Sequence, residues 1–567
     1  MLYEKHSKEF PKHSMVTPTV SNDVELTHET AIKQELLHGN LFDDNIDHFK
    51  KTIYREDDNI QRVFLNGLSA YMKNPNNSRL LAPTGEGKTY LTSEISKTFS
   101  SSDVIFLASA SAQSFKYDFS DYVVMNDDGS LESMREKLTD LETKLASESD
   151  SKQKKSLTYQ IKQIRSNAYG LVDFSNKWII FSDSQNFSLW ESLKPLLSHD
   201  SEYIVHKVTN KLGGKNTTQN IIFRGKPAVT YCSAKDESKH DVTGEIDSRF
   251  DTISLHNDKQ KYRDSLTLIA KKQGLAGELF DDEVVSKHEQ KLACMRTQLL
   301  KDQILKYGQK DNPVLNPFMI TISEIFPNDS GMRSRQLDRF GQMINLICIC
   351  NANRRSKVII GDDEYPIVSI NDVLQTTKII KESPVIPTYK IQFFNDVIRK
   401  AIQDLANDSN ISKRTEGTID EKTWITASEI SDFAEKTLDK KFGRQKTQET
   451  YLKDLEDHGY VESIQDSTNK SRKLYSISSK YADIPASLES TLIDTSTLDE
   501  SCVKSFLDRY VKHRLSSKNI QIVDESGKSI SLGKLASTLC IIDTDMSDSS
   551  HKSDSVEASI GIEIFED

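Results

Sequence analysis

The sequence predicts an α/β fold in which a parallel sheet carries a phosphate-binding loop, a coiled-coil hairpin is inserted, and a smaller α+β module and an acidic tail follow. Three observations predict it. Residues 78–99 read as strand, glycine loop and helix; short apolar runs recur after them; and the pattern at 423–477 changes to helix, turn, helix and hairpin. At 567 residues the chain exceeds what one hydrophobic core usually supports, so several domains are expected.

The glycine loop reads Ala-Pro-Thr-Gly-Glu-Gly-Lys-Thr over residues 82–89. The two glycines let backbone N–H groups close on phosphates, while the lysine would reach the β- and γ-phosphates and the threonine a magnesium ion. The loop predicts binding of ATP or GTP, and we expect ATP with Mg²⁺. The residues expected to hold the nucleotide are Ala82, Pro83, Thr84, Gly85, Glu86, Gly87, Lys88, Thr89 and Tyr90.

Two further apolar runs, at 103–108 and 177–183, fit buried strands of the same sheet. The second run ends on Asp183, which would hold the magnesium through water. In most ATPases of this kind a glutamate that orients the attacking water comes next, but here Ser184 follows. Gln185 or Glu191 could substitute, because a glutamine can orient water without accepting its proton. The sequence leaves the rate of hydrolysis open.

A fourth strand is expected at 226–233, after a shorter apolar run at 219–223. Its polar end offers Thr230 or Ser233 as a hydroxyl that senses the γ-phosphate. Arg249 follows shortly after this strand. A planar, always-charged guanidinium spreads over phosphate oxygens, so Arg249 is expected to act as a finger on a neighbouring subunit's nucleotide. The alternative for a single arginine is a surface ion pair.

The stretch at 127–172 has apolar residues at steps of three and four on both sides of a Ser/Asp-rich break. This spacing predicts two helices that form an antiparallel coiled-coil hairpin, the second of which takes in Ala168 and Leu171. Its basic residues could touch nucleic acid or could form a solvated face. They are Lys152, Lys154, Lys155, Lys162 and Arg165.

Residues 256–310 are strongly charged and predict a helical connecting arm, and Arg335 then begins an apolar helix at 331–350. Loop, metal strand, sensor strand, finger and arginine-led helix follow one another as in the AAA+ ATPases, which residues 55–380 resemble. The segment 334–337 is similar to the lid of the minichromosome maintenance helicases, and other stretches look like uncharacterised archaeal ATPases of this type. The resemblance implies a helical lid, a ring commonly of six subunits, a nucleotide at each subunit boundary, and a sensor role for Arg335.

The region 411–480 resembles a winged helix, with helices at 424–433 and 447–458 and a β-hairpin after Gly459. In such a module the second helix enters the major groove of duplex DNA. Gln445, Gln448 and Tyr451 could reach base edges, and the alternative is a module used only for protein contacts. The basic residues expected to contact phosphates are Lys440, Lys441, Arg444, Lys446, Lys453, Lys470, Arg472 and Lys473.

The remaining chain is less informative. No apolar run is long enough to span a membrane and no signal peptide is evident, so a cytoplasmic protein is expected. The net charge of -11 argues against a uniformly basic nucleic-acid surface, and the six scattered cysteines fit buried thiols better than a metal site. The expected divisions are a disordered leader at 1–45, an NTPase core at 46–325, a helical lid and connector at 326–410, the winged helix at 411–480, a helical extension at 481–542 whose residues 501–515 pack on the winged helix, and an acidic disordered tail at 543–567 that docks on a partner or solubilises the chain.

These features together predict an ATP-driven motor acting on DNA, of helicase or translocase type, in replication, recombination or a mobile element. A slowly hydrolysing, ATP-gated DNA-binding switch or transcription regulator is the second possibility, which Ser184 favours. The third is an ATPase that remodels proteins and uses the coiled-coil hairpin as its substrate arm.

Overall fold

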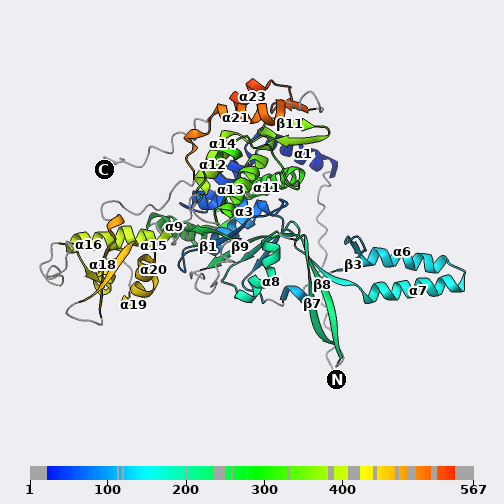
Figure 1. The fold of residues 1–567 in the computed structure, drawn as a ribbon, viewed down its shortest axis with the longest axis horizontal. Helices are drawn as coiled ribbons and strands as arrows, with labels where there is room; N and C mark the ends of the chain where they lie inside the picture. Colours follow the sequence, from blue (N-terminus) through cyan, green and yellow to red (C-terminus); the bar gives the residue numbers. More distant parts are fainter. Residues whose placement is uncertain are drawn as a thin grey trace.

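The fold is seen in a computed structural model of the chain (Figure 1). The residues that it describes are 22–111, 114–117, 121–199, 201–212, 215–233, 249–256, 259–277, 279, 281, 284–328, 332–380, 388–406, 422–438, 443–466, 472–481, 493–512 and 520–542. No helix among them is both long and apolar enough to cross a lipid bilayer.

The centre of the molecule is a five-stranded parallel sheet with strand order β10-β1-β9-β6-β2. Strands β6 and β9 are buried along their whole length, as expected for parallel strands covered on both faces. The structure confirms the α/β class and the parallel sheet, and the runs predicted at 103–108, 177–183 and 226–233 contain β2, β6 and β9. The fifth strand, β10, was not predicted. The strands are β1 (Asn77–Leu81), β2 (Val104–Leu107), β6 (Trp178–Phe181), β9 (Ala228–Ser233) and β10 (Asp251–Ser254).

Helix α3 (Asp57–Ser69) packs directly on this sheet. Its approach depends on Gly67, because a Cβ atom there would lie 2.8 Å from ring atoms of both Phe99 and Trp178. The connections that follow β1, β2 and β6 contain the helices α4 (Lys88–Ser96), α5 (Ser114–Tyr117) and α8 (Phe187–Leu197), respectively.

A second five-stranded sheet, of mixed direction, lies between β2 and β9 in the sequence and has strand order β4-β3-β5-β8-β7. The sequence analysis did not foresee this sheet, and it placed residues 168–171 wrongly in a helix, whereas they reach into β5. Its strands are β3 (Asp121–Met125), β4 (Leu131–Ser133), β5 (Tyr169–Asp173), β7 (Tyr203–Leu212) and β8 (Lys215–Arg224).

Two helices, α6 (Met134–Ser147) and α7 (Ser151–Ser166), connect β4 to β5. They lie side by side and project away from the rest of the chain, on the right of Figure 1. Arg165 of α7 pairs with Glu142 of α6 at 2.9 Å, so the two helices run antiparallel as the spacing at 127–172 predicts.

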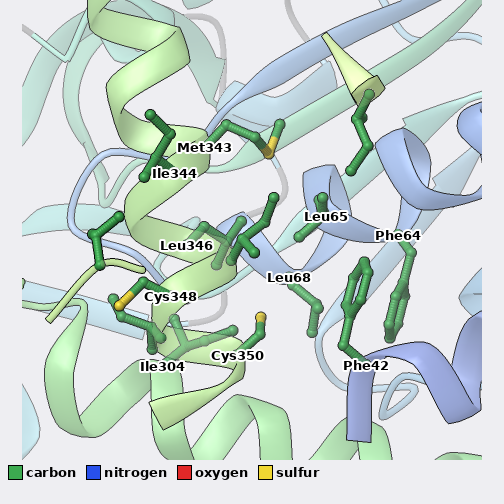
Figure 2. Close-up of a cluster of buried hydrophobic side chains, with 14 of the residues drawn as sticks. Phe42, Phe64, Leu65, Leu68, Ile304, Met343, Ile344, Leu346, Cys348 and Cys350 are labelled. Carbon is green, nitrogen blue, oxygen red and sulfur yellow. The ribbon is translucent and has the colours of Figure 1, made fainter. Parts of the chain in front are cut away.

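A helical layer above the central sheet shares one large apolar core with it (Figure 2). Phe42 of α2 stacks on Phe64 of α3, with ring centroids 5.6 Å apart. The expected disordered leader is therefore wrong for residues 22–45, while residues 1–21 lie outside the described part. The layer contains α1 (Asn22–His38), α2 (Leu41–Lys50), α11 (Lys287–Tyr307), α12 (Met319–Ile325), α13 (Met332–Cys350), η3 (Ala352–Arg354) and α14 (Ile370–Ile379). Helix α9 (Lys259–Gly274) lies instead beside the loop that follows β1, where Lys261 donates to the carbonyl of Glu86.

The segments at 256–310 and 493–542 also differ from expectation. Helix α11 buries Leu300 and Ile304 in the large core, so it is part of the body and not a connecting arm. Strand β16 (Ile520–Val523) pairs with β11 (Lys357–Ile360), which in turn pairs with β12 (Asp363–Pro366). The extension packs on the large core and not on the predicted winged helix. Its helical segments are η8 (Thr495–Thr497), α21 (Glu500–Phe506), η9 (Leu507–Lys512) and α23 (Leu532–Leu539).

Residues 388–481 form a separate module with its own apolar core. Three helical segments pack on a three-stranded antiparallel sheet of order β13-β15-β14. The first segment lies in this core, although the sequence analysis had placed it in the connector. The elements are α15 (Thr388–Phe393), η4 (Phe394–Ile398), α16 (Arg399–Leu405), β13 (Ile425–Thr426), α18 (Ala427–Leu438), α19 (Arg444–Lys446), η6 (Thr447–Leu452), α20 (Lys453–Asp457), β14 (Val461–Gln465), β15 (Lys473–Ile477) and η7 (Ser479–Tyr481).

Candidate nucleotide site

The predicted glycine loop joins β1 to the first turn of α4. Gly85 and Gly87 have φ of 92° and 89°, in the left-handed region that side chains rarely adopt, and Gly87 is the N-cap of α4. A Cβ atom at either position would meet no atom within 4 Å. The backbone conformation, not lack of space, requires glycine here, and the loop presents the N terminus of a helix to open surface.

Lys88 lies over this loop. Its Nζ donates to the carbonyl oxygens of Ala82 at 2.6 Å and Pro83 at 2.9 Å. Burial lowers the pKa of Lys88, and the groups of Cys232, Glu86 and Asp183 partly oppose that shift. A half-buried ammonium that is held by carbonyls alone gains from a phosphate oxygen, because charge-assisted hydrogen bonds are about twice as strong as neutral ones.

The ends of β6 and β9 meet beside the loop. Ser233 ends β9 and pairs in register with Leu81, the last residue of β1, while Asp183 lies two residues past β6. The Ser233 hydroxyl forms a 3.0 Å hydrogen bond with that of Ser184. Lys88, Asp183 and Ser233 therefore gather at the carboxyl edge of the parallel sheet.

Thr230, the alternative sensor, lies inside the fold. Its hydroxyl accepts hydrogen bonds from Trp178 Nε1 at 2.9 Å and from Asn66 Nδ2 at 2.8 Å, and its side chain is fully buried. Of the two hydroxyls, only that of Ser233 is placed toward the loop.

One of the thiols expected to be buried, that of Cys232, lies behind the site, a position that the sequence analysis did not assign to it. Burial raises the pKa of Cys232 to about 11, against the nearby positive charge of Lys88. The thiol also faces the hydroxyls of Thr92 and Thr89. A neutral group therefore occupies the position under the loop lysine, and no sequence signal marks it beyond its place in β9.

The predicted magnesium ligands fit the chemistry of that ion. In the part of the chain that the structure describes, no three His, Cys, Asp or Glu side chains gather as a metal cage. Magnesium is commonly held by one or two protein oxygens together with phosphates and water. Thr89, which is exposed at the start of α4, and Asp183 would provide two such oxygens.

Gln185 does not serve as the water-orienting group in this arrangement. Its Nε2 donates to the carbonyls of Asp183 at 2.6 Å and Ala108 at 3.1 Å, and its Oε1 accepts from Ala110 N at 2.9 Å. The amide ties together the loops that follow β2 and β6. Glu191, the other candidate, is exposed on α8, 3.9 Å from Lys194.

A buried ion pair fixes the loop from the side of α9, and sequence reasoning missed it. Lys261 Nζ pairs with Glu56 at 2.6 Å and also donates to the carbonyl of Glu86 at 3.2 Å. Tyr262 donates its hydroxyl to the Glu86 carboxylate at 2.7 Å. Both Lys261 and Glu56 are almost fully buried, so α9 holds the loop through the residue between its two glycines.

Tyr90, expected beside the nucleotide, joins α4 to its neighbours. Its hydroxyl donates to the carbonyl of Thr52 at 3.2 Å, and the Lys272 ammonium lies 5.2 Å from its ring centroid. Burial raises its pKa to about 12, so the hydroxyl stays protonated and able to donate.

Arg249 and Arg335 come together, but at the other end of β1. They line a pocket of about 210 Å³ with Arg339, Asn76, Asn77 and one acidic residue, Asp338. The five-residue strand β1 separates this pocket from the loop of the same chain by about 15 Å. Arg335 therefore lies away from its own nucleotide loop.

Two of the arginines in this pocket have contacts that bear on their charge. Arg249 Nε donates to Ser198 Oγ at 2.6 Å. Burial lowers the pKa of Arg339, which Asp251 opposes and the positive charge of Arg335 reinforces. Arg339 was not predicted as a site residue, although its place one helical turn after Arg335 is a signal that could have found it.

The predicted DNA contacts divide into three groups. Arg444, Lys446 and Lys453 are exposed on the third helical segment of the small module (α19, η6 and α20), whereas Lys440, Lys441 and Lys470 lie outside the described residues. Arg472 pairs with the buried Asp466, and Lys473 pairs with Glu456 at 3.1 Å. Arg472 and Lys473 therefore already form ion pairs within the module.

The base-edge candidates are also engaged. Tyr451 is buried and stacks on Phe393 with centroids 4.1 Å apart, so its assignment to base contact is wrong. Gln445 donates to Glu449 at 3.0 Å, and Gln448 bonds to Tyr475.

Comparisons with known proteins give little beyond this geometry. No family model matches the sequence, and no curated protein matches it. Among solved structures, that of the Aeropyrum pernix Orc1 protein in complex with DNA is similar, with 12% identity over 82% of this chain and 94% of that chain and a TM-score of 0.19. At this TM-score the likeness supports no further statement. The chain's own sheet order and loop show a mixed α/β fold with a parallel central sheet and a glycine loop between β1 and α4.

Proposed function

We propose that this chain is a DNA-acting ATPase of AAA+ type that binds ATP at the glycine loop. The observation that carries the proposal is the meeting of Lys88, Asp183 and Ser233 at the carboxyl edge of a parallel sheet, around a loop whose glycines have left-handed backbones. ATP is proposed over GTP from the resemblance in the sequence.

Each group has a distinct task in this proposal. The N–H groups of the loop and Lys88 bind the β- and γ-phosphates, and Thr89 and Asp183 hold magnesium, which neutralises phosphate charge. The hydroxyls of Ser233 and Ser184, already 3.0 Å apart, donate to the γ-phosphate or orient the attacking water. Glu86 and Lys261 keep the loop in the shape that this binding requires.

The second half of the site comes from a neighbouring copy. Arg249, Arg335 and Arg339 outnumber the one acidic residue of their pocket, Asp338, and lie about one strand length from the nucleotide loop of their own chain. A head-to-tail contact would bring this pocket to the next copy's γ-phosphate. We therefore propose a closed ring, of six subunits as the resemblance implies, in which Arg335 acts as a sensor across the boundary together with Arg249.

The small module at 388–481 is proposed to be a winged helix that contacts duplex DNA. Three helical segments and a β-hairpin support this assignment, as do the exposed Arg444, Lys446 and Lys453 on the third segment. Because Arg472 and Lys473 pair with acids of their own module, we assign the phosphate contacts to the helix and not to those two residues.

A slowly hydrolysing, ATP-gated switch is the second candidate. The position of the usual glutamate holds Ser184, and the Gln185 amide is bonded to three backbone groups. A hydroxyl cannot take the proton of the attacking water as a carboxylate does.

Measurement of ATP turnover, with and without duplex DNA, tests the proposal. A motor predicts turnover that duplex DNA stimulates strongly; a switch predicts tight ATP binding with almost no turnover. Lys88→Ala serves as the loop variant and Lys97→Ala, whose lysine pairs with Glu94 on the surface of α4, as the matched control. A wild-type chain that binds no ATP would overturn both candidates.

A further inference from the structure

Helix α7 differs in charge from its partner α6. Along α6 three basic residues balance three acidic ones, whereas α7 carries five basic residues and no Asp or Glu. The whole chain has a net charge of -11. This concentration of positive charge is therefore local to one helix of the projecting pair.

Three of these charges share one face with an aromatic side chain. At about 100° per residue, Lys152, Lys155, Tyr159 and Lys162 fall within an arc of about 80°. The arc lies opposite the buried Ile161, which packs toward α6. All four side chains are exposed, and the tyrosine is 63% accessible. We call these four residues the basic face of α7.

The lysines of the basic face are not used in holding the hairpin together. Over the described part of the chain, none of the three forms an ion pair, whereas Arg165 of the same helix pairs with Glu142 of α6 at 2.9 Å. The Tyr159 hydroxyl accepts one hydrogen bond, from Gln163 at 2.9 Å. Like charges on one helix face that holds no acid repel one another, and an anionic partner relieves that repulsion.

We propose that the basic face of α7 binds the phosphate backbone of nucleic acid, as a second contact separate from the small module. From Lys152 to Lys162 the helix rises about 15 Å, which spans several phosphates along a strand of a duplex. The helix pair projects from the body (Figure 1), so a duplex reaches this face without meeting the core.

Two features favour nucleic acid over an acidic protein. Phosphates recur at a fixed spacing along any sequence, so three lysines on one helix face find partners in every register. The exposed tyrosine between them offers a ring on which an unpaired base can stack. The inference relies on the proposed function only for nucleic acid as the class of partner.

The test uses the full chain with Lys152, Lys155 and Lys162 all changed to glutamine, which keeps helix propensity. Fluorescence anisotropy with labelled duplex and single-stranded DNA is measured over a range of salt. We expect affinity at low salt to fall at least about tenfold, and the slope of log K against log salt to become shallower by about 2.7 on duplex or about 2 on single strands.

The matched control carries the same loss of charge at Lys97, Lys504 and Lys512, each changed to glutamine. These lysines are exposed and pair with acids on their own helices, at 2.6, 3.1 and 3.1 Å. Its salt slope should stay that of the wild type. An unchanged slope for the α7 variant on both kinds of DNA would overturn the inference.

A third variant separates this inference from the proposed function. Changing Arg444, Lys446 and Lys453 to glutamine removes the three phosphate contacts proposed for the small module. If this variant loses DNA binding while the α7 variant keeps the wild-type slope, the inference fails and the proposed function stands. If the wild-type chain binds no DNA, both fail.

Discussion

The two ends of strand β1 carry the same sign of charge in different settings. At the carboxyl end, Lys88 lies over an open glycine loop and is held by two carbonyls. At the amino end, three arginines line a pocket of about 210 Å³ with two asparagines. The loop end has the backbone and the lysine to bind phosphates, and the other end has guanidinium groups that can contact phosphate oxygens. Within one chain the two ends are separated by the length of β1. In the proposed function each end is half of a phosphoryl-transfer site, which two copies together would complete.

The largest expected effect comes from the arginine end. Arg249→Ala combined with Arg335→Ala should lower ATP turnover by about 10³-fold, or about 4 kcal/mol, because arginine fingers stabilise transition-state charge. ATP affinity should change little, since the loop is intact. Turnover and binding are measured on the same preparation, with Arg135→Ala on exposed α6 as the control. Full turnover in the double variant would show that the arginine pocket is not part of the ATPase site.

The next prediction concerns the buried ion pair that holds the glycine loop. Lys261→Met leaves the Glu56 carboxylate buried without its partner and should cost about 3 kcal/mol of the free energy of unfolding. Adding Glu56→Gln should recover part of the loss. Urea denaturation measures both. The control is Lys50→Met, whose exposed pair with Asp47 is worth less than about 1 kcal/mol. Equal losses in the two single variants would contradict the assignment.

At the loop itself, Lys88→Ala should weaken Mg²⁺–ATP binding by about 2–3 kcal/mol, or roughly 100-fold, through the loss of charge-assisted hydrogen bonds. Isothermal titration calorimetry measures this change. The arginine variants give the opposite pattern, with binding kept and turnover lost. If Lys88→Ala bound ATP as tightly as the wild type, the two ends would not differ as described.

The smallest effect is a dependence on pH. Burial lowers the pKa of Lys88, so the ammonium that binds phosphate is present at low pH and is lost as pH rises through that lowered pKa. ATP affinity should therefore fall at alkaline pH, before exposed lysines lose their charge. Lys88→Arg, which stays charged, should flatten this fall. Identical pH profiles for the two proteins would show that the lysine does not titrate in this range.

The sequence predicted the parts of the fold in which local pattern and tertiary role coincide. The loop at 82–89, the apolar runs that became β2, β6 and β9, and the paired helices α6 and α7 each carry a short-range signal. The second sheet has no local signal of comparable strength, because its strands are held together by pairing between segments far apart in the sequence, such as β5 with β8. Leu171 had helical spacing and yet lies in β5, since pairing with β8 decides its state.

Site residues divide in the same way. Lys88, Asp183 and Ser233 follow from their positions after strands. The buried pair of Glu56 and Lys261 joins residues 205 positions apart, and nothing in either local sequence marks it. Gln185 shows the converse: its position after Asp183 suggested chemistry, but its amide is bonded to backbone groups of two loops.

The most direct test mixes two inactive variants. Lys88→Ala removes the loop end, and Arg249→Ala with Arg335→Ala removes the pocket end. If one copy's pocket completes the next copy's loop, mixing the two proteins under conditions of subunit exchange should restore part of the ATP turnover, because some boundaries then combine an intact loop with an intact pocket. A mixture that assembles but stays as inactive as its components would contradict a shared site.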